Sequence, residues 1–273
     1  MAGVGAGPAS GPAVDRLAAT SAPRKNGSRP RDRAGLEEVV MELWVGTSGY
    51  SYKEWKGSFY PAKLPDSEML RSYAERLPAV EINNTFYRLP KADMLETWAG
   101  EVPGDFRFVL KASRRITHIK RLRDAGDETA YLYQTALSLG PHMGVVLFQM
   151  PPNFQKDLPR LQAFLDLLPA GRGAALEFRH PSWFEEDVYQ SLREHRCALC
   201  LSDTDEGPIE AIVATTDWGY LRLRKEKYTK KTIAALSEQV RSQAWKSAYV
   251  FFKDEGEGRG PKYALQFLEL AGA

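Results

Sequence analysis

Carboxylate, amide and cationic side chains recur at the ends of short apolar runs in this sequence. Glu81 and Asn83 end one run, and Glu177 and Arg179 end another. Four further runs close in the same way, with Lys111, with Gln149, with Asp203, and with Arg222 followed by Arg224. Because an unpaired buried charge is costly, these side chains must pair with one another, contact water or hold a ligand.

Carboxylates beside fixed cations suit proton transfer, because their surroundings move their pKa values apart. We therefore expect Glu81 and Glu177 to act as general acid and base, with Asp203 orienting them or binding a metal. The cations expected to bind an anionic part of the substrate are Lys111, Arg179 and Arg222. Further residues predicted to contact substrate are Tyr50, Trp55, Asn83, His118, Gln149, His180 and Arg224. On this interpretation Glu177 is poised for a ligand and is not a structural ion pair.

The chemistry implied is that of an enzyme acting on a small anionic or sugar-like molecule. Hydrolase, lyase and isomerase reactions all remain open, and two carboxylates would also serve glycoside hydrolysis. A single Mg²⁺ or Mn²⁺ bound by Glu81, Glu177 and Asp203 is also open, although four histidines are few for a multinuclear site. No GxGxxG, Walker, GxSxG or HExxH arrangement occurs, so no nucleotide cofactor is indicated.

Eight short β-rich runs alternate with helical patterns after residue 40. The runs cover residues 43–47, 79–83, 105–111, 144–149, 174–179, 198–203, 219–223 and 248–253. Helical patterns lie near 66–77, 91–100, 127–139, 157–168, 183–195, 229–243 and 261–271, so only the sixth connection is thin. This alternation predicts an α/β fold, a single (β/α)8 TIM-type barrel over residues 41–273. Active sites of such barrels lie at the C-terminal ends of the strands, where the polar side chains fall.

Two local patterns carry their own predictions. Ser182 and Glu185 have the spacing of a capping box, which predicts a helix starting there. Cys197 and Cys200 form a CxxC spacing inside an apolar run. Residues three apart on a strand face opposite sides, so this spacing predicts two separate buried thiols and no metal or redox pair.

Composition sets broader limits. The chain is 43% hydrophobic and 26% charged with a formal net charge of +2, so its overall charge favours neither nucleic acid nor an anionic membrane. Residues 1–40 are rich in Gly, Ala, Pro, Ser and Arg without periodicity, which predicts a disordered tail. No apolar stretch approaches the ~18–20 residues of a membrane span, and no secretory signal is evident. We therefore expect a cytoplasmic chain without a membrane partner, whose oligomeric state the pattern leaves undefined.

Two other functions remain open. Residues 50–60 hold five aromatic side chains and two lysines in a connection expected to overhang the strand ends. These rings would either stack on a sugar or nucleobase or simply pack, and a basic stretch follows at 222–231. Together they allow a nucleic-acid-binding or phosphodiester-processing protein. The third interpretation is a non-catalytic scaffold whose charged strand ends form a structural ion ring.

Several motifs resemble those of the YecE-like family, known as domain of unknown function 72. They occupy residues 45–50, 59–61, 81–87, 117–118, 148–152 and 177–183, in family order. The resemblance implies a TIM-barrel-like fold from about residue 43 to 270 and no established activity. Many family members have His-Gly after the arginine of the seventh strand, whereas Leu223-Arg224-Lys225 stands here. No role of that histidine is therefore carried over.

Overall fold

Eight parallel strands close into one barrel in the computed structural model, which describes residues 41–207, 209, 211–253 and 258–272. The strands pair in chain order, and β8 pairs with β1. They are β1 Glu42–Ser48, β2 Ala79–Ile82, β3 Arg107–Lys111, β4 Met143–Gln149, β5 Ala174–Glu177, β6 Ala198–Asp203, β7 Trp218–Leu223 and β8 Ser247–Phe252. The predicted (β/α)8 barrel is confirmed. The tail predicted at residues 1–40 lies outside the described residues.

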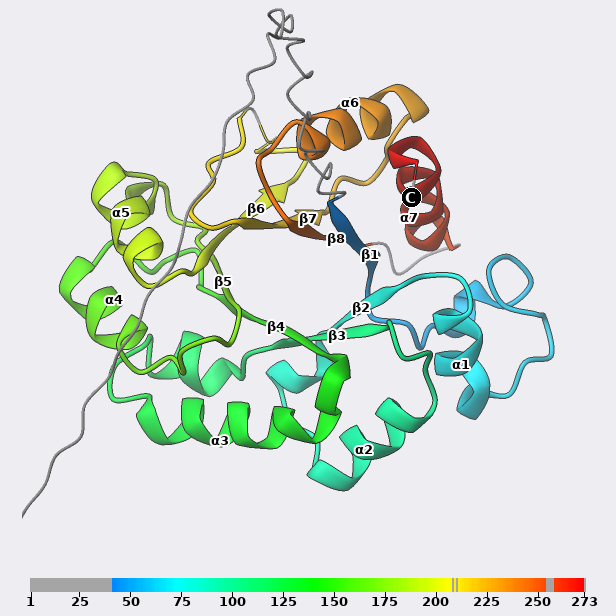
Figure 1. The fold of residues 1–273 in the computed structure, drawn as a ribbon, viewed down its shortest axis with the longest axis horizontal. Helices are drawn as coiled ribbons and strands as arrows, with labels where there is room; N and C mark the ends of the chain where they lie inside the picture. The colour runs from blue at the N-terminus through cyan, green and yellow to red at the C-terminus, as the bar shows by residue number, and fades with distance from the viewer. Residues whose placement is uncertain (1–40, 208, 210, 254–257, 273) are drawn as a thin grey trace, which may run out of the picture. The chain divides into compact units, whose positions relative to one another are not determined.

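In the part of the chain that the structure describes, seven helices surround the barrel (Figure 1). They are α1 Met69–Ala74, α2 Ala92–Gly100, α3 Gly126–Ala136, α4 Leu158–Leu165, α5 Glu186–Glu194, α6 Lys230–Arg241 and α7 Arg259–Ala271. Short 3₁₀ helices are η1 Lys53–Trp55, η2 Asp66–Glu68, η3 Asn84–Phe86, η5 Leu137–His142 and η6 Pro181–Trp183, and η4 Arg115–Ile119 is a π-helix. Between β6 and β7 no helix occurs among the described residues, in agreement with the thin sixth connection.

Alternate residues of each strand divide the barrel into a lumen and an outer core. Lumen residues such as Val109, Leu147 and Cys200 form one apolar cluster, and the residues between them pack beneath the helices. Cys197 belongs to the outer core, so the two cysteines face opposite sides as predicted. Burial raises the pKa of the Cys197 thiol to about 12 and that of Cys200 well above its usual value.

The same alternation places the polar strand ends in one layer. Two residues beyond the apolar lumen layer, each strand presents its next inward side chain at the C-terminal mouth. These residues include Ser48, Glu81, Lys111, Gln149, Glu177 and Arg222. The fold therefore gathers charges from strands far apart in sequence.

The predicted capping box at Ser182 is wrong. Helix α5 begins only at Glu186, and Ser182 lies in the separate turn η6, which Pro181 starts. The Ser182 hydroxyl oxygen instead accepts the backbone N–H of Lys156 at 2.8 Å. A capping box does occur at α6, where Thr229 and Thr232 bond reciprocally and begin the helix that follows β7.

None of the helices in the described part of the chain is long and apolar enough to cross a bilayer.

Candidate functional site

Arg222 lies between two glutamates at the barrel mouth. Its Nε and Nη2 donate to Oε2 and Oε1 of Glu81 at 2.9 and 2.8 Å, and its Nη1 donates to Oε2 of Glu177 at 2.6 Å. Both carboxylates are fully buried, and Arg222 is 2% exposed. We call these three residues, from β2, β5 and β7, the ion network. Its bidentate geometry is the strong form of an arginine–carboxylate pair.

Neighbouring side chains complete the hydrogen bonding of both carboxylates. The hydroxyls of Ser48 and Tyr220 donate to Glu81 at 2.7 and 2.6 Å, and the amide of Asn83 lies at 3.3 Å. On Glu177, Oε1 accepts from Gln149 at 2.7 Å and from Arg179 at 3.1 Å. Every oxygen of the ion network therefore has a donor. Such saturation is what a structural ion ring requires.

The pKa values of the two glutamates do not suit acid–base work. Burial alone would raise the pKa of Glu177, but the charges of Arg222 and Arg179 together lower it to about 2. Burial would likewise raise the pKa of Glu81. The charge of Arg222 outweighs this effect, so the pKa of Glu81 is also lowered. Both side chains are then ionised at neutral pH and poor proton acceptors. The predicted roles of general acid and base find no support in this geometry.

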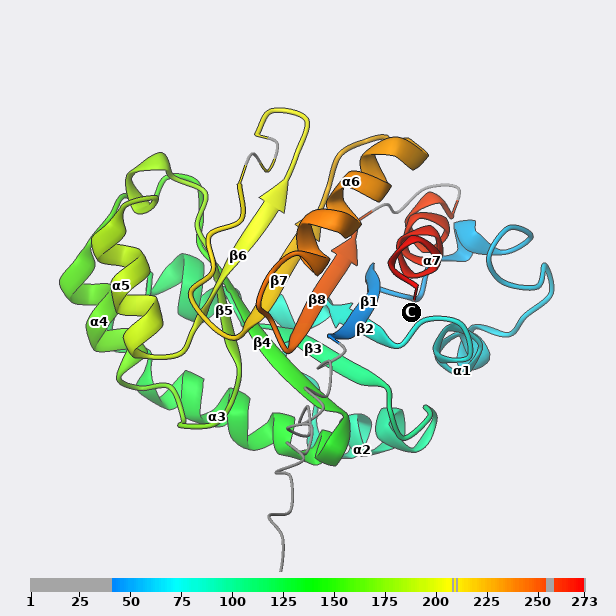
Figure 2. The ribbon, with the colours of Figure 1, turned by 45° about the horizontal axis from the view of Figure 1, so that its top comes forward.

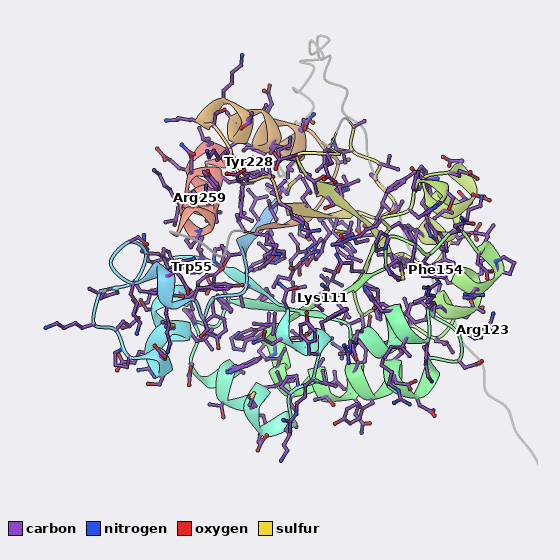
Figure 3. All side chains as sticks on the ribbon, turned by 180° about the vertical axis from the view of Figure 1, so that it is seen from behind. Trp55, Lys111, Arg123, Phe154, Tyr228 and Arg259 are labelled. Atoms are coloured by element: carbon purple, nitrogen blue, oxygen red, sulfur yellow. The ribbon has the colours of Figure 1, made fainter. Side chains whose placement is uncertain are left out.

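A second set of charges, Lys111, Arg179 and Arg224, lies around the ion network, and we call it the cationic rim. The Nζ of Lys111 lies 4.5 Å from the ring centroid of Phe86, and Figure 3 places Lys111 near the barrel axis. Nη1 of Arg224 lies 3.8 Å from Oε1 of Glu177. With Arg222, these groups set four cations against two carboxylates. Within this cluster of described side chains, positive charge is therefore in excess.

Lys111 is the rim residue whose pKa is most useful for chemistry. Burial first, and then the charge of Arg222, lower its pKa from 10.5 to about 8, although both glutamates oppose the shift. His118 lies nearby, its ring 4.9 Å from that of Phe86. Burial and the charges of Lys111 and Arg179 lower the pKa of His118 as well. The structure thus brings a weakly basic amine and a neutral imidazole to one side of the mouth.

Asp203 does not join this site, and its predicted place there is wrong. Its carboxylate faces outward, where it accepts from Tyr228 and the Ile209 backbone N–H and pairs with Lys225 at 3.0 Å. Alternation explains the error: Cys200 faces the lumen, so Asp203, three residues later, faces the outer core. With Lys225 neutralised in this way, the basic stretch at 222–231 is also less cationic than its sequence suggests.

The carboxylates that the sequence left open as Mg²⁺ or Mn²⁺ ligands do not converge on one point. Arg222 occupies the space between Glu81 and Glu177, and Asp203 points away from both. No cluster of three or more His, Cys, Asp or Glu side chains that could hold a metal ion occurs within the described residues.

Three other predicted contact residues have packing or hydrogen-bond partners outside the ion network. Trp55 is fully buried against Tyr52, Phe59 and Tyr60, and Figure 3 shows it in the peripheral segment after β1, away from Lys111. Tyr50 packs against Tyr73, and burial followed by the charge of Glu101 raises its pKa to about 12. His180 bonds Ser182 through Nδ1 at 2.9 Å. The aromatic connection after β1 therefore packs into the outer core, as one of the two alternatives left open by the sequence has it, and Trp55 has no exposed surface for a ligand.

Ser48, Tyr220 and Phe86 belong to the site but were not singled out from the sequence. Ser48 and Tyr220 could have been found, because each lies in the lumen register of its strand, Tyr220 two residues before Arg222. Phe86 had no such signal, since it lies in the turn after β2 and meets Lys111 only through the fold.

A parallel eight-stranded barrel with a charged C-terminal mouth is thus the class of this protein. The sequence profile described as "Protein of unknown function DUF72" matches residues 44–273. The chain therefore belongs to the DUF72 family, which confirms the resemblance drawn from its motifs.

Curated relatives and solved structures agree with this membership. The chain is 32% identical over 173 residues to YecE of Escherichia coli, covering 62% of this chain and 61% of that protein. It is 30% identical over 157 residues to YunF of Bacillus subtilis, covering 54% of each. The matches thus span about three fifths or less of these relatives' length.

A DUF72 family protein of Thermotoga maritima superposes with a TM-score of 0.76 at 27% identity, over 85% of this chain and all of that one. One from Enterococcus faecalis, at 20% identity and a TM-score of 0.70, covers 86% of this chain and 96% of that one and supports the fold alone.

Proposed function

We propose that this protein is an enzyme that binds a small anionic substrate on its cationic rim and uses the Lys111 amine as proton acceptor. The proposal rests on the position of Lys111. Its amine is partly buried beside cations at the barrel mouth, where every carboxylate oxygen of the ion network already accepts a hydrogen bond. An amine with a pKa of about 8 is neutral in roughly a tenth of molecules at pH 7, which suffices for a general base.

The ion network supports this function without taking part in proton transfer. Because its carboxylates are fully bonded, they hold Arg222 rigidly and leave the charges of Lys111, Arg179 and Arg224 in excess. A bound carboxylate or phosphate supplies the counter-charge that the rim lacks. Preorganised cations of this kind stabilise negative charge that develops in a transition state.

The proton transfer needs only the Lys111 amine and the substrate. The neutral Lys111 amine takes a proton from a carbon or hydroxyl next to the substrate's anionic group, and the electron pair stays on the substrate. Arg179 and Arg224, which both lie beside Glu177, stabilise that new negative charge. Proton abstraction of this type belongs to isomerases and lyases more than to hydrolases.

The test compares wild type with Lys111→Met in a mixture of small cellular acids and sugar phosphates, followed by mass spectrometry. We expect the wild type to convert at least one anionic compound and Lys111→Met to convert it at least a hundredfold more slowly. Lys231→Met, on an exposed part of α6, is the matched control and should behave as wild type.

Equal conversion by wild type and Lys111→Met would remove the amine from the mechanism. If no compound is converted and the rim binds no anion, the charged mouth is a structural ion ring. The saturated ion network is the observation that keeps this scaffold interpretation as the second candidate.

A further inference from the structure

A pocket of about 830 Å³ opens through the barrel wall beside the mouth. Its lining is mixed: Phe178, Phe184, Leu199 and Leu201 are apolar, Glu206 adds a carboxylate, and the buried Glu177 lies with Arg224 at its inner end. We call it the lateral pocket. It joins an apolar surface to the charges of the ion network and the cationic rim.

The opening follows from the pairing of two strands. Strands β5 and β6 pair only at Ala175–Ala198 and Leu176–Leu199. Beyond Leu199, β6 stays paired with β7 as far as Asp203, and it diverges from the chain that follows β5 (Figure 2). The wall is therefore incomplete at the level of Glu177, where other neighbouring strands remain paired.

The lateral pocket exposes a large apolar side chain to solvent. Phe184 is 47% exposed and lines the pocket in the turn before α5. An exposed aromatic residue over a concave apolar wall is typical of a binding site for an apolar group.

Polar atoms at the inner end lack hydrogen-bond partners. The Oγ of Ser202 and the Nε of Arg224 are buried, and neither bonds to any atom of the described residues. Both residues line the lateral pocket. Buried donors normally find an acceptor, so these two atoms leave hydrogen-bonding capacity unused behind the wall of the pocket.

We infer that the substrate is an anion that carries an aromatic or branched apolar arm. The arm lies in the lateral pocket against Phe184 and Leu201, and the carboxylate or phosphate meets the guanidinium groups of Arg179 and Arg224. This inference rests on the proposed function and adds the chemical class of the substrate to it.

The test is calorimetric titration with phenyl phosphate and with inorganic phosphate, and in parallel with phenylacetate and acetate to separate phosphate from carboxylate. We expect the phenyl compound of at least one pair to bind at least tenfold more tightly than its parent anion. Phe184→Ala should reduce this preference at least threefold and leave the parent anion's affinity unchanged. The control Tyr131→Ala, which removes a 58% exposed ring from α3, should change neither.

The possible failures are distinguishable. Equal affinities of the parent and phenyl anions, or a preference that Phe184→Ala does not reduce, would overturn the lateral-pocket assignment and leave anion binding intact. If no anion binds at all, the proposed function itself fails, and this inference fails with it.

Discussion

Arg222 holds Glu81 by two parallel hydrogen bonds, Nε to Oε2 at 2.9 Å and Nη2 to Oε1 at 2.8 Å. Strands β2 and β7 carry these residues, 141 positions apart in the chain. The remaining Nη1 bonds Glu177 on β5, so one guanidinium joins three strands across the lumen. This link explains why the glutamates are ionised and why Arg179, Arg222 and Arg224 share two carboxylates between them.

Glu177→Gln should lower the free energy of unfolding by about 3–5 kcal/mol, because it leaves Nη1 of Arg222 buried without a charged partner. Urea unfolding at pH 7 measures the change. The exposed Glu238→Gln on α6 is the control and should stay within about 0.5 kcal/mol of wild type. Unchanged or higher stability of Glu177→Gln would instead restore the interpretation of Glu177 as poised for a ligand.

The pair of Glu177 and Arg222 also predicts that the free energy of unfolding depends on pH in the acid range. The pKa of Glu177 is lowered from 4.5 to about 2 in the folded state, so its stabilising effect is complete above pH 4.5 and is lost as the pH falls toward 2. The difference in unfolding free energy between wild type and Glu177→Gln should therefore shrink across this range. Urea titrations at pH 5, 4, 3 and 2.5 test this, and a constant difference would contradict the lowered pKa.

The charge of Lys111 should destabilise the folded state, in contrast to the charge of Glu177. Its folded pKa of about 8 is below its usual 10.5, so its charge destabilises the fold below pH 8, and the penalty disappears as the pH rises to 10.5. Lys111→Met should therefore raise stability at pH 7 by on the order of 1 kcal/mol, after allowance for solvent screening and the lost contact with Phe86. The gain should decline between pH 8 and 10. A variant less stable than wild type at pH 7 would show that the amine is well solvated or well paired.

Asp203→Asn separates the outer core from the mouth. The substitution weakens bonds to Tyr228, Lys225 and the Ile209 N–H, so we expect a loss of about 1–3 kcal/mol in unfolding free energy. Phosphate affinity, measured by calorimetry, should not change. A large loss of affinity without loss of stability would return Asp203 to the site.

Much of the fold follows from sequence because each strand and helix has a local pattern. The mouth was partly predictable for the same reason: Glu81, Glu177 and Arg222 end apolar runs in the lumen register. The prediction that Asp203 lies in the site was wrong because a position at a strand end does not show which face of the strand a residue occupies. Asp203 shares the outer face of β6 with Leu201. The odd spacing between the lumen residue Cys200 and Asp203 indicates that outer face.

Other features depend on contacts that no single segment contains. The burial of Trp55 arises from packing against neighbouring aromatic rings in its own connection, which the amphipathic composition leaves undecided. That Arg222 reaches carboxylates on both β2 and β5 is a property of barrel closure. The pKa of Lys111 depends in turn on that geometry, so neither its value nor its role could be predicted from neighbouring residues.

The described side chains of the mouth hold cations in excess, with Lys111 as the weak base among them. The most direct test of this arrangement is the pKa of Lys111, measured by NMR on protein with ¹³C-labelled lysine and assigned with Lys111→Met, without anion and with saturating inorganic phosphate. The account predicts a pKa of about 8 without phosphate and a higher value with it, because a bound anion stabilises the protonated amine. A pKa near 10.5 that phosphate does not change would contradict the account.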